Sequence, residues 1–253
     1  MHLRLEQDGP VARLLIDRPD RRNAMTQTMW EQLPQLVGQA MADDAIRVLI
    51  LASATPGLFC AGADIHEFAT CSPQEDWRVA NQAAIRASQY ALAHAQKPVI
   101  AAIDGDCVGG GCGLAIACDL RIASPTARLG ITPAKLGIVY SLFDTKLLVD
   151  LVGPARAKRI LFTGALHTAD DALAIGLIEE IAPDPLTAAE TLARTIAANP
   201  QHSVRASKAI VRRILDGQAD DDATTLALFR DAFTLPDFAK GVTAFRTKSR
   251  PDF

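Results

Sequence analysis

The stretch from Lys97 to Asp119, KPVIAAIDGDCVGGGCGLAIACD, decides the fold of this 253-residue chain. Its apolar residues 99–103 predict a short buried strand, and residues 104–106 predict a turn. Gly109 to Gly111 then precede a helix of small residues, expected over 112–118. The first amides of a helix have no partner within it and lie at the positive end of its dipole. Bare glycine amides at this point are therefore suited to bind a phosphate or a developing oxyanion.

Two nucleotide-binding interpretations of the glycines are excluded by the neighbouring residues. A P-loop needs Gly-Lys-Ser/Thr after the glycines, whereas Cys112-Gly113-Leu114 follows here. A Rossmann fingerprint needs a sixth-position glycine, and counting from Gly109 that position is Leu114. An oxyanion hole remains as the ligand-binding interpretation. The alternative is that the glycines only permit close packing of the strand and the helix.

The composition is that of an ordinary globular protein, with 49% hydrophobic and 22% charged residues and a net charge of −3. Such a charge predicts no nucleic-acid partner. No apolar run approaches the roughly 18 residues of a membrane span. The first residues, MHLRLE, lack the apolar segment of a signal peptide, so we expect a cytoplasmic protein without a membrane partner.

The cysteines and histidines predict neither a metal site nor a disulfide framework. The five cysteines form no C-x-x-C pair, and the five histidines form no H-E-x-x-H group. Cys107, Cys112 and Cys118 lie among small and apolar residues, so we expect buried thiols there.

Apolar runs and periodicity predict alternating strands and helices up to about residue 127, and mainly helices after it. This pattern is typical of an α/β architecture. Strands are expected over 3–7, 11–17, 46–52, 99–103, 120–123 and 177–181. Helices are expected from residue 24, after residue 64, and over 77–96, 112–118, 141–151, 154–162, 169–175, 186–198, 203–215, 220–233 and 236–246, with a polar, mobile segment at 70–76. We divide the chain into an α/β core, residues 1–199, and a helical C-terminal segment, residues 200–253.

Four motifs in order resemble the enoyl-CoA hydratase/isomerase family, also called the crotonase superfamily, over nearly the whole chain. They are residues 20–25 (DRRNAM), residues 59–65 (FCAGADI), the central stretch from Lys97 to Asp119, and the tail with Ala244-Phe245, Lys248 and Pro251-Asp252-Phe253. The resemblance implies a spiral of stacked ββα turns whose C-terminal helices pack in a homotrimer or a dimer of trimers. It also implies an acyl-CoA thioester as substrate, with no cofactor beyond the CoA moiety.

The resemblance also assigns residues to the binding of that thioester. The family's two oxyanion-hole amides fall on Ala63 and Gly110, where they would hold the thioester oxygen as it becomes an enolate. Contacts to the CoA nucleotide fall on the loop residues Arg22, Ala24, Ala61 and Ile65, with Asp64 bracing the loop. Phe245 and Lys248 resemble tail residues that reach the CoA from the next subunit, although Lys248 could equally be an ordinary tail charge.

The chain departs from the family's hydratases at both catalytic glutamates. Gly113 and Pro133 stand at those positions, and neither can transfer a proton, so water addition by a glutamate pair is not expected. The segment from Thr132 to Tyr140 resembles methylmalonyl-CoA decarboxylase, although that enzyme carries a glutamate where Gly113 stands. Loss of CO2 from a malonyl-type thioester needs an oxyanion hole but no general base for its first step. Tyr140 would then orient the carboxylate, and its alternative role is that of a half-buried aromatic residue.

Two other functions remain open. Asp144, one helical turn after Tyr140, could serve an isomerase or an acyl-CoA hydrolase as base or nucleophile, or it could only stabilise a helix N-terminus. The chain could also bind acyl-CoA without turning it over. His66 and Glu67 are expected to be solvated or packed.

Overall fold

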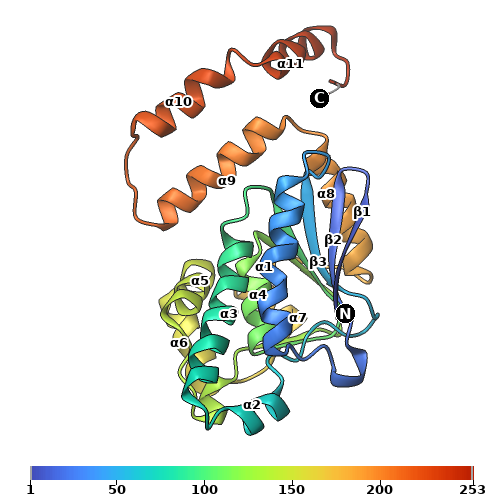
Figure 1. Cartoon of the computed structure of the whole chain (residues 1–253). Coiled ribbons are helices and arrows are strands. Elements are labelled where there is room, and N and C mark those ends of the chain that lie inside the picture. The colour runs from blue at the N-terminus through green and yellow to red at the C-terminus, as the bar shows by residue number, and fades with distance from the viewer. Residues whose placement is uncertain (1, 252) are drawn as a thin grey trace.

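The computed structural model describes residues 2–251 and 253, and it has a mixed α/β fold built on two sheets (Figure 1). In the larger sheet the strands follow the order β1-β2-β3-β4-β6-β9, and all neighbours are parallel except the β1–β2 hairpin. The smaller sheet has the order β5-β7-β8. The strands are β1 (Leu3–Asp8), β2 (Val11–Ile16), β3 (Val48–Ser53), β4 (Val99–Ile103), β5 (Asp106–Val108), β6 (Leu120–Ala123), β7 (Arg128–Gly130), β8 (His167–Thr168) and β9 (Glu180–Ile181).

Helices connect most of these strands, and the last ones close the chain. The α-helices are α1 (Gln27–Ala42), α2 (Ile65–Cys71), α3 (Glu75–Ala93), α4 (Gly110–Ala117), α5 (Leu142–Val152), α6 (Pro154–Thr163), α7 (Ala169–Ala174), α8 (Pro185–Ala197), α9 (Gln201–Leu215), α10 (Ala223–Ala232) and α11 (Pro236–Thr247), with short 3-10 helices η1 (Pro19–Arg21) and η2 (Pro133–Leu136). None of the described helices is long and apolar enough to cross a bilayer.

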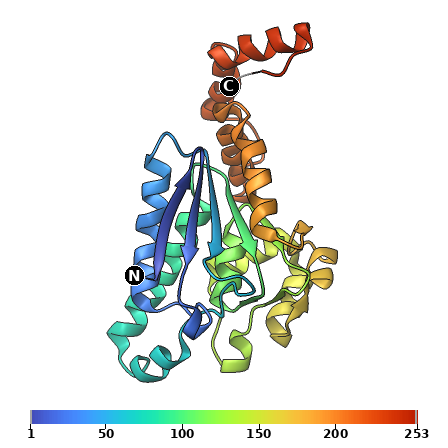
Figure 2. The same ribbon diagram turned by 90° about the vertical axis from the view of Figure 1, so that its right-hand side faces the viewer.

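The larger sheet is buried on both faces, which explains its continuous apolar runs. Helix α8 covers one face, and α1, α3 and α4 lie on the other side (Figure 2). In β3, Leu49 and Leu51 belong to the core on the side of α1, whereas Val48, Ile50 and Ala52 pack on the side of α8. Alternate side chains of a strand point to opposite faces, so a doubly covered strand is apolar at every position.

Lys97 has a structural role at the start of the central stretch. Its side chain is buried, and its Nζ donates to the carbonyls of Ala40, at 2.9 Å, and Asp43, at 2.7 Å. These carbonyls lie at the C-terminal end of α1, where no intrahelical donor is available. Lys208 on α9 donates to the Lys97 carbonyl at 2.9 Å and so joins α9 to the same point.

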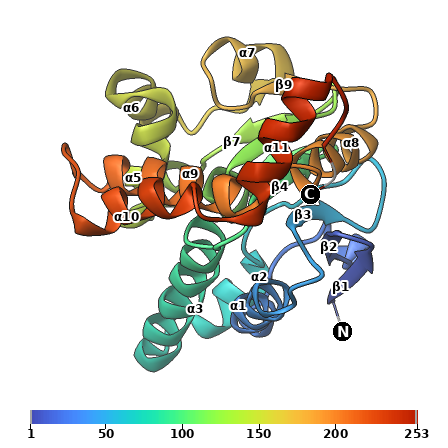
Figure 3. The ribbon, with the colours of Figure 1, turned by 90° about the horizontal axis from the view of Figure 1, so that it is seen from above.

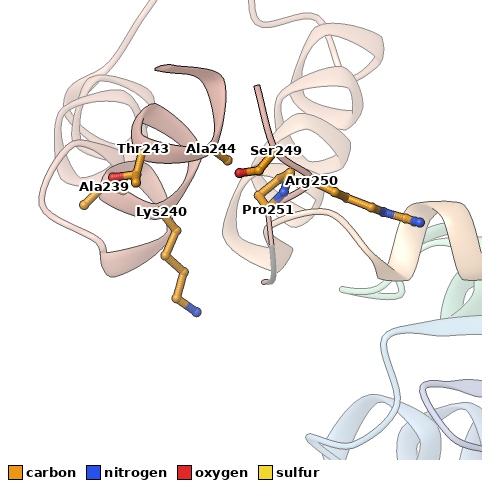
Figure 4. Close-up of a pocket in the computed structure, with 7 residues that line it drawn as sticks. All are labelled: Ala239, Lys240, Thr243, Ala244, Ser249, Arg250 and Pro251. Atoms are coloured by element: carbon orange, nitrogen blue, oxygen red, sulfur yellow. The ribbon is translucent and has the colours of Figure 1, made fainter. Parts of the chain in front are cut away.

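Helices α9 to α11 extend beyond the layers that enclose the larger sheet (Figures 1 and 2), and in the view from above they lie in front of those layers (Figure 3). Between α11 and the tail lies a hollow (Figure 4), lined by Ala239, Lys240, Thr243, Ala244, Ser249, Arg250 and Pro251. Helix α11 is at the opposite end of the molecule from α2, so this hollow is remote from the loop that leads into α2 (Figure 1).

The structure corrects several predicted elements. Strands β5, β7 and β8 were not predicted, because two or three residues are too few to establish a period. The polar segment at 70–76 is shorter than predicted, since α2 continues to Cys71 and α3 begins at Glu75. There Phe68 and Trp77 pack edge to face with 5.1 Å between their ring centroids, which ties α2 to α3.

Candidate active site

The amide of Ala63 is left free by the way its segment pairs with the chain at Met25. Met25 N donates to Gly62 O at 2.7 Å, and Asp64 N donates to Met25 O at 2.9 Å. Successive amides of an extended segment point to opposite sides, so the N–H of Ala63 faces away from Met25. No acceptor within the described residues binds it.

The amide of Gly110 opens helix α4 and is also free. Gly109 N donates to Gly130 O at 2.8 Å, and Gly113 N donates to Gly109 O at 3.0 Å, which begins the helix. Gly110 N has no acceptor in the part of the chain that the structure describes. A Cβ atom built on Gly110 would lie 3.6 Å from Ala63 N and 3.1 Å from the Trp30 ring. The two predicted oxyanion amides are therefore neighbours, and neither is occupied by a carbonyl of the chain itself.

The loop predicted to meet the CoA nucleotide lies against the segment that carries Ala63. Ala61 N donates to Arg22 O at 3.0 Å, which brings Arg22, Ala24 and Ala61 together. Ile65 is the exposed first residue of α2. The fully buried Asn23 adopts a positive φ of 54°, and its Nδ2 donates to Ser53 Oγ at 2.8 Å and Phe59 O at 2.9 Å. This buried amide holds the loop in its shape.

Asp64 braces this loop and begins α2. Its carboxylate accepts from Arg18 at 2.7 Å and from the amides of His66, at 2.9 Å, and Glu67, at 3.3 Å. Burial alone would raise the pKa of Asp64, but these hydrogen bonds outweigh it and hold the pKa below its usual value. Glu67 accepts from Gln27 N at 2.8 Å and is packed, as expected, while His66 is exposed.

Tyr140 and Asp144 lie together beside α4. A Cβ atom built on Gly113 would be 3.0 Å from Tyr140 Oη, which has no hydrogen-bond partner within the described residues. Burial, followed by the charge of Asp144, raises the pKa of Tyr140 well above its usual value, so its hydroxyl stays protonated. Asp144 Oδ2 accepts from the helix-capping Ser141 Oγ at 2.7 Å, whereas Oδ1 is buried without a described partner. Burial raises the pKa of Asp144 despite the Ser141 bond.

Gln89 on α3 completes this group, and sequence reasoning missed it. Its side chain is 1% exposed, and its Nε2 lies 2.3 Å from the Cβ position of Gly113. The buried face of α3 carries Asn81, Ala84, Ser88, Gln89 and Leu92 at helical spacing. Polar residues at core positions of an amphipathic helix were the signal that could have revealed it.

The tail residues assigned to CoA do not join this site within one chain. Phe245 is 87% exposed on α11, and Lys248 ends that helix in a left-handed conformation, with φ 53°. Both lie at the end of the molecule opposite α2 (Figure 1).

Three cysteines are buried, as their apolar surroundings in the sequence predict. Cys107, Cys112 and Cys118 are buried free thiols. Among residues 2–251 and 253, no three His, Cys, Asp or Glu side chains are grouped so as to hold a metal ion.

Comparison with known proteins identifies the family. The family model described as enoyl-CoA hydratase/isomerase matches residues 6–253. The chain belongs to the enoyl-CoA hydratase/isomerase family. As a family member, it is an acyl-CoA enzyme with the predicted crotonase-type fold.

The relatives and solved structures that resemble this chain match nearly its whole length. The chain is 34% identical to the short-chain-enoyl-CoA hydratase of Clostridium acetobutylicum, with 97% of this chain and 95% of the relative covered. The crystal structure of an enoyl-CoA hydratase/isomerase family protein from Hyphomonas neptunium has a TM-score of 0.96 and 41% identity, covering 100% of this chain and 97% of the other. The enoyl-CoA hydratase from Bacillus anthracis gives a TM-score of 0.91 and 30% identity, covering 100% and 99%.

Gly62→Ala should separate the two free amides. Gly62 has a φ of 95°, and its added Cβ would lie 2.7 Å from Val108 O and 3.0 Å from Gly110 N. Loss of one oxyanion-hole donor typically lowers kcat about 10²- to 10³-fold, because the negative oxygen is less well stabilised. We therefore expect the variant to bind the enolate of acetoacetyl-CoA about 10²-fold more weakly. Enolate absorbance in the ultraviolet measures this. Gly57→Ala is the control, with a φ of 73° and open space around its Cβ. Equal enolate binding by Gly62→Ala and wild type would contradict the expectation.

Asp144→Asn should stabilise the fold at neutral pH. The pKa of Asp144 is raised in the folded state, so its ionisation above that pKa opposes folding, and the cost disappears below the unfolded pKa near 4. The asparagine keeps an acceptor for Ser141. We expect the free energy of unfolding to rise by about 1 kcal/mol at pH 8, with a difference that vanishes toward pH 3.5, as measured by denaturant unfolding. Asp170→Asn, at an exposed first-turn position of α7, is the control. A pH-independent difference would refute this account.

Proposed function

We propose that this family member releases CO2 from a malonyl-type CoA thioester, with Ala63 and Gly110 stabilising the enolate and Tyr140 orienting the carboxylate. The observation that carries the proposal is that the two free amides and the protonated tyrosine hydroxyl lie beside Gly110 and Gly113, two positions on the same side of α4. CoA would be held by the loop of Arg22, Ala24, Ala61, Asp64 and Ile65.

The first step of this reaction needs no general acid or base. The bond between the α-carbon and the carboxyl carbon breaks, CO2 leaves, and the bonding electrons pass into the enolate. Its negative oxygen faces the two amides, which act without reorganising. The α-carbon then takes a proton from water or from a neutral Asp144. Burial favours the neutral form of Asp144, which lessens its repulsion of the substrate carboxylate.

The absence of the hydratase glutamates supports this choice over hydration. At position 113 a side chain would meet Gln89 Nε2 at 2.3 Å and Tyr140 Oη at 3.0 Å, so these two residues fill the space. Pro133 opens η2 and carries no ionisable group. The relatives named above as hydratases share the fold, and the proposal concerns what this chain does differently.

A second candidate is an isomerase or hydrolase that uses Asp144. It is favoured by the buried carboxyl of Asp144, whose pKa is raised by burial and whose Oδ1 has no described partner, because such a carboxyl is a candidate for proton transfer. A family member that only binds acyl-CoA is the non-catalytic alternative.

A panel of CoA thioesters read by mass spectrometry separates these functions. We expect CO2 release from methylmalonyl-CoA or ethylmalonyl-CoA, and little hydration of crotonyl-CoA. Tyr140→Phe should lower decarboxylation about 10- to 100-fold through loss of one hydrogen bond to a charged group, while Asp144→Asn should spare the CO2-releasing step. Isomerisation of a 3-enoyl-CoA or release of free CoA, abolished by Asp144→Asn, would instead establish the second candidate. Binding without any turnover would leave the non-catalytic one.

We also propose that the protein assembles as a homotrimer or a dimer of trimers through its C-terminal helices. Large apolar side chains are exposed along α9 to α11, namely Val211, Ile214, Leu226, Phe229, Phe233, Phe238 and Phe245. A monomer rarely exposes large apolar patches, and so many exposed apolar side chains on successive helices favour an interface with other copies of the chain. In such an assembly Phe245 and Lys248 would reach a neighbouring site.

Sedimentation equilibrium should therefore give the mass of three or six chains. Phe229→Asp should shift the distribution toward smaller species, because a charge would be buried in the interface. Lys158→Asp, at an exposed position on α6, should leave the distribution unchanged. A monomeric wild-type protein would rule the assembly out.

A further inference from the structure

The side-chain amide of Gln89 is a buried polar group that has no role in the reaction proposed above. It is 1% exposed, and neither Nε2 nor Oε1 has a hydrogen-bond partner among the residues the structure describes. The neighbouring Ser88, on the same helix and equally buried, donates to Trp30 O at 2.6 Å. Gln89 therefore differs from the structural polar residue beside it.

The amide is aimed at the acyl end of the proposed site. Its Nε2 and Tyr140 Oη both lie next to the Cβ position of Gly113, at 2.3 and 3.0 Å. Gly113 is three residues after Gly110, hence on the same side of α4 and about 4.5 Å further along the axis. Gln89 and Tyr140 thus form one wall within a short reach of the oxyanion amides.

A buried amide without a partner destabilises the fold, and a leucine of similar size would avoid that cost. Such a group is explained when a ligand supplies the missing bond. Resting on the function proposed above, we propose that Gln89 is a substrate-binding residue that recognises an anionic carboxylate on the α-carbon of the acyl group, together with Tyr140.

The donors fit a carboxylate that has to leave as CO2. Gln89 Nε2 offers two N–H donors, and the protonated Tyr140 hydroxyl offers one. Neither of the two described side chains nearest the Cβ position of Gly113, Gln89 and Tyr140, is cationic. Neutral donors orient the carboxylate without the strong ground-state stabilisation that a lysine or arginine would give, and such stabilisation would raise the barrier to its loss.

The test uses two CoA thioesters of matched shape that cannot lose CO2. Sulfoacetyl-CoA carries a sulfonate in place of the carboxylate, and 3,3-dimethylbutyryl-CoA carries a tert-butyl group there. Calorimetric titration gives Kd for each ligand with wild type, Gln89→Leu and Gln82→Leu. Gln82 is exposed on the same helix and serves as the control.

We expect Gln89→Leu to weaken sulfoacetyl-CoA binding about 10- to 100-fold while it retains or improves binding of the tert-butyl ligand. Gln82→Leu should change neither. Unchanged sulfoacetyl-CoA binding, or equal weakening of both ligands, would overturn the assignment, since the first shows no contact and the second a general distortion. Because the readout needs no turnover, selective binding combined with no CO2 release from malonyl-type substrates would refute the proposed reaction and leave Gln89 as an anion-recognising residue.

Discussion

The close approach of two backbone segments, one at Ala63 and one at Gly110, is the constraint on which the rest of the site depends. Each segment is held from its outer side, Ala63 through the pairing with Met25 and Gly110 through the bond from Gly109 to Gly130. This leaves the inner amides free and adjacent. A Cβ on Gly62 would lie 3.0 Å from Gly110 N, so contact at this distance requires glycine. The donors belong to the main chain and are rigid, which is the condition for stabilising charge without reorganisation.

Gln89, Tyr140 and Asp144 contribute buried polar atoms that have no partner among the described residues. Buried polar atoms normally find partners inside the protein. Here several of them face the first turns of α4, and burial shifts the pKa of Tyr140 and Asp144 upward. Both groups are thereby biased toward their neutral, hydrogen-bond-donating forms. Unpartnered polar atoms lower the stability of the fold at this place, and the proposed recognition of an anionic acyl group would account for them.

Much of the fold was predictable because its core strands obey simple rules. Strand β4 at Val99–Ile103 and β6 at Leu120–Ala123 were predicted with their observed bounds. Doubly buried strands are apolar at every position and are bounded by turn residues. Strands β5, β7 and β8 escaped prediction because they owe their existence to neighbours across the sheet. Gln89 escaped because an alanine-rich helix gives weak contrast between its faces, so the polar residues at its core positions were not recognised as buried.

The sequence by itself determined the family, through ordered motifs, and the resemblance to that family led to the prediction that the oxyanion amides are those of Ala63 and Gly110. It also determined the absence of glutamates at positions 113 and 133. Only the tertiary structure decided which side chains occupy the space next to Gly113. Gln89 on α3 and Tyr140, just before α5, are distant in sequence and meet there by packing. Burial raises the pKa values of Tyr140 and Asp144 and leaves the Gln89 amide without a described partner. This burial results from the tertiary packing, so no local sequence pattern encodes it.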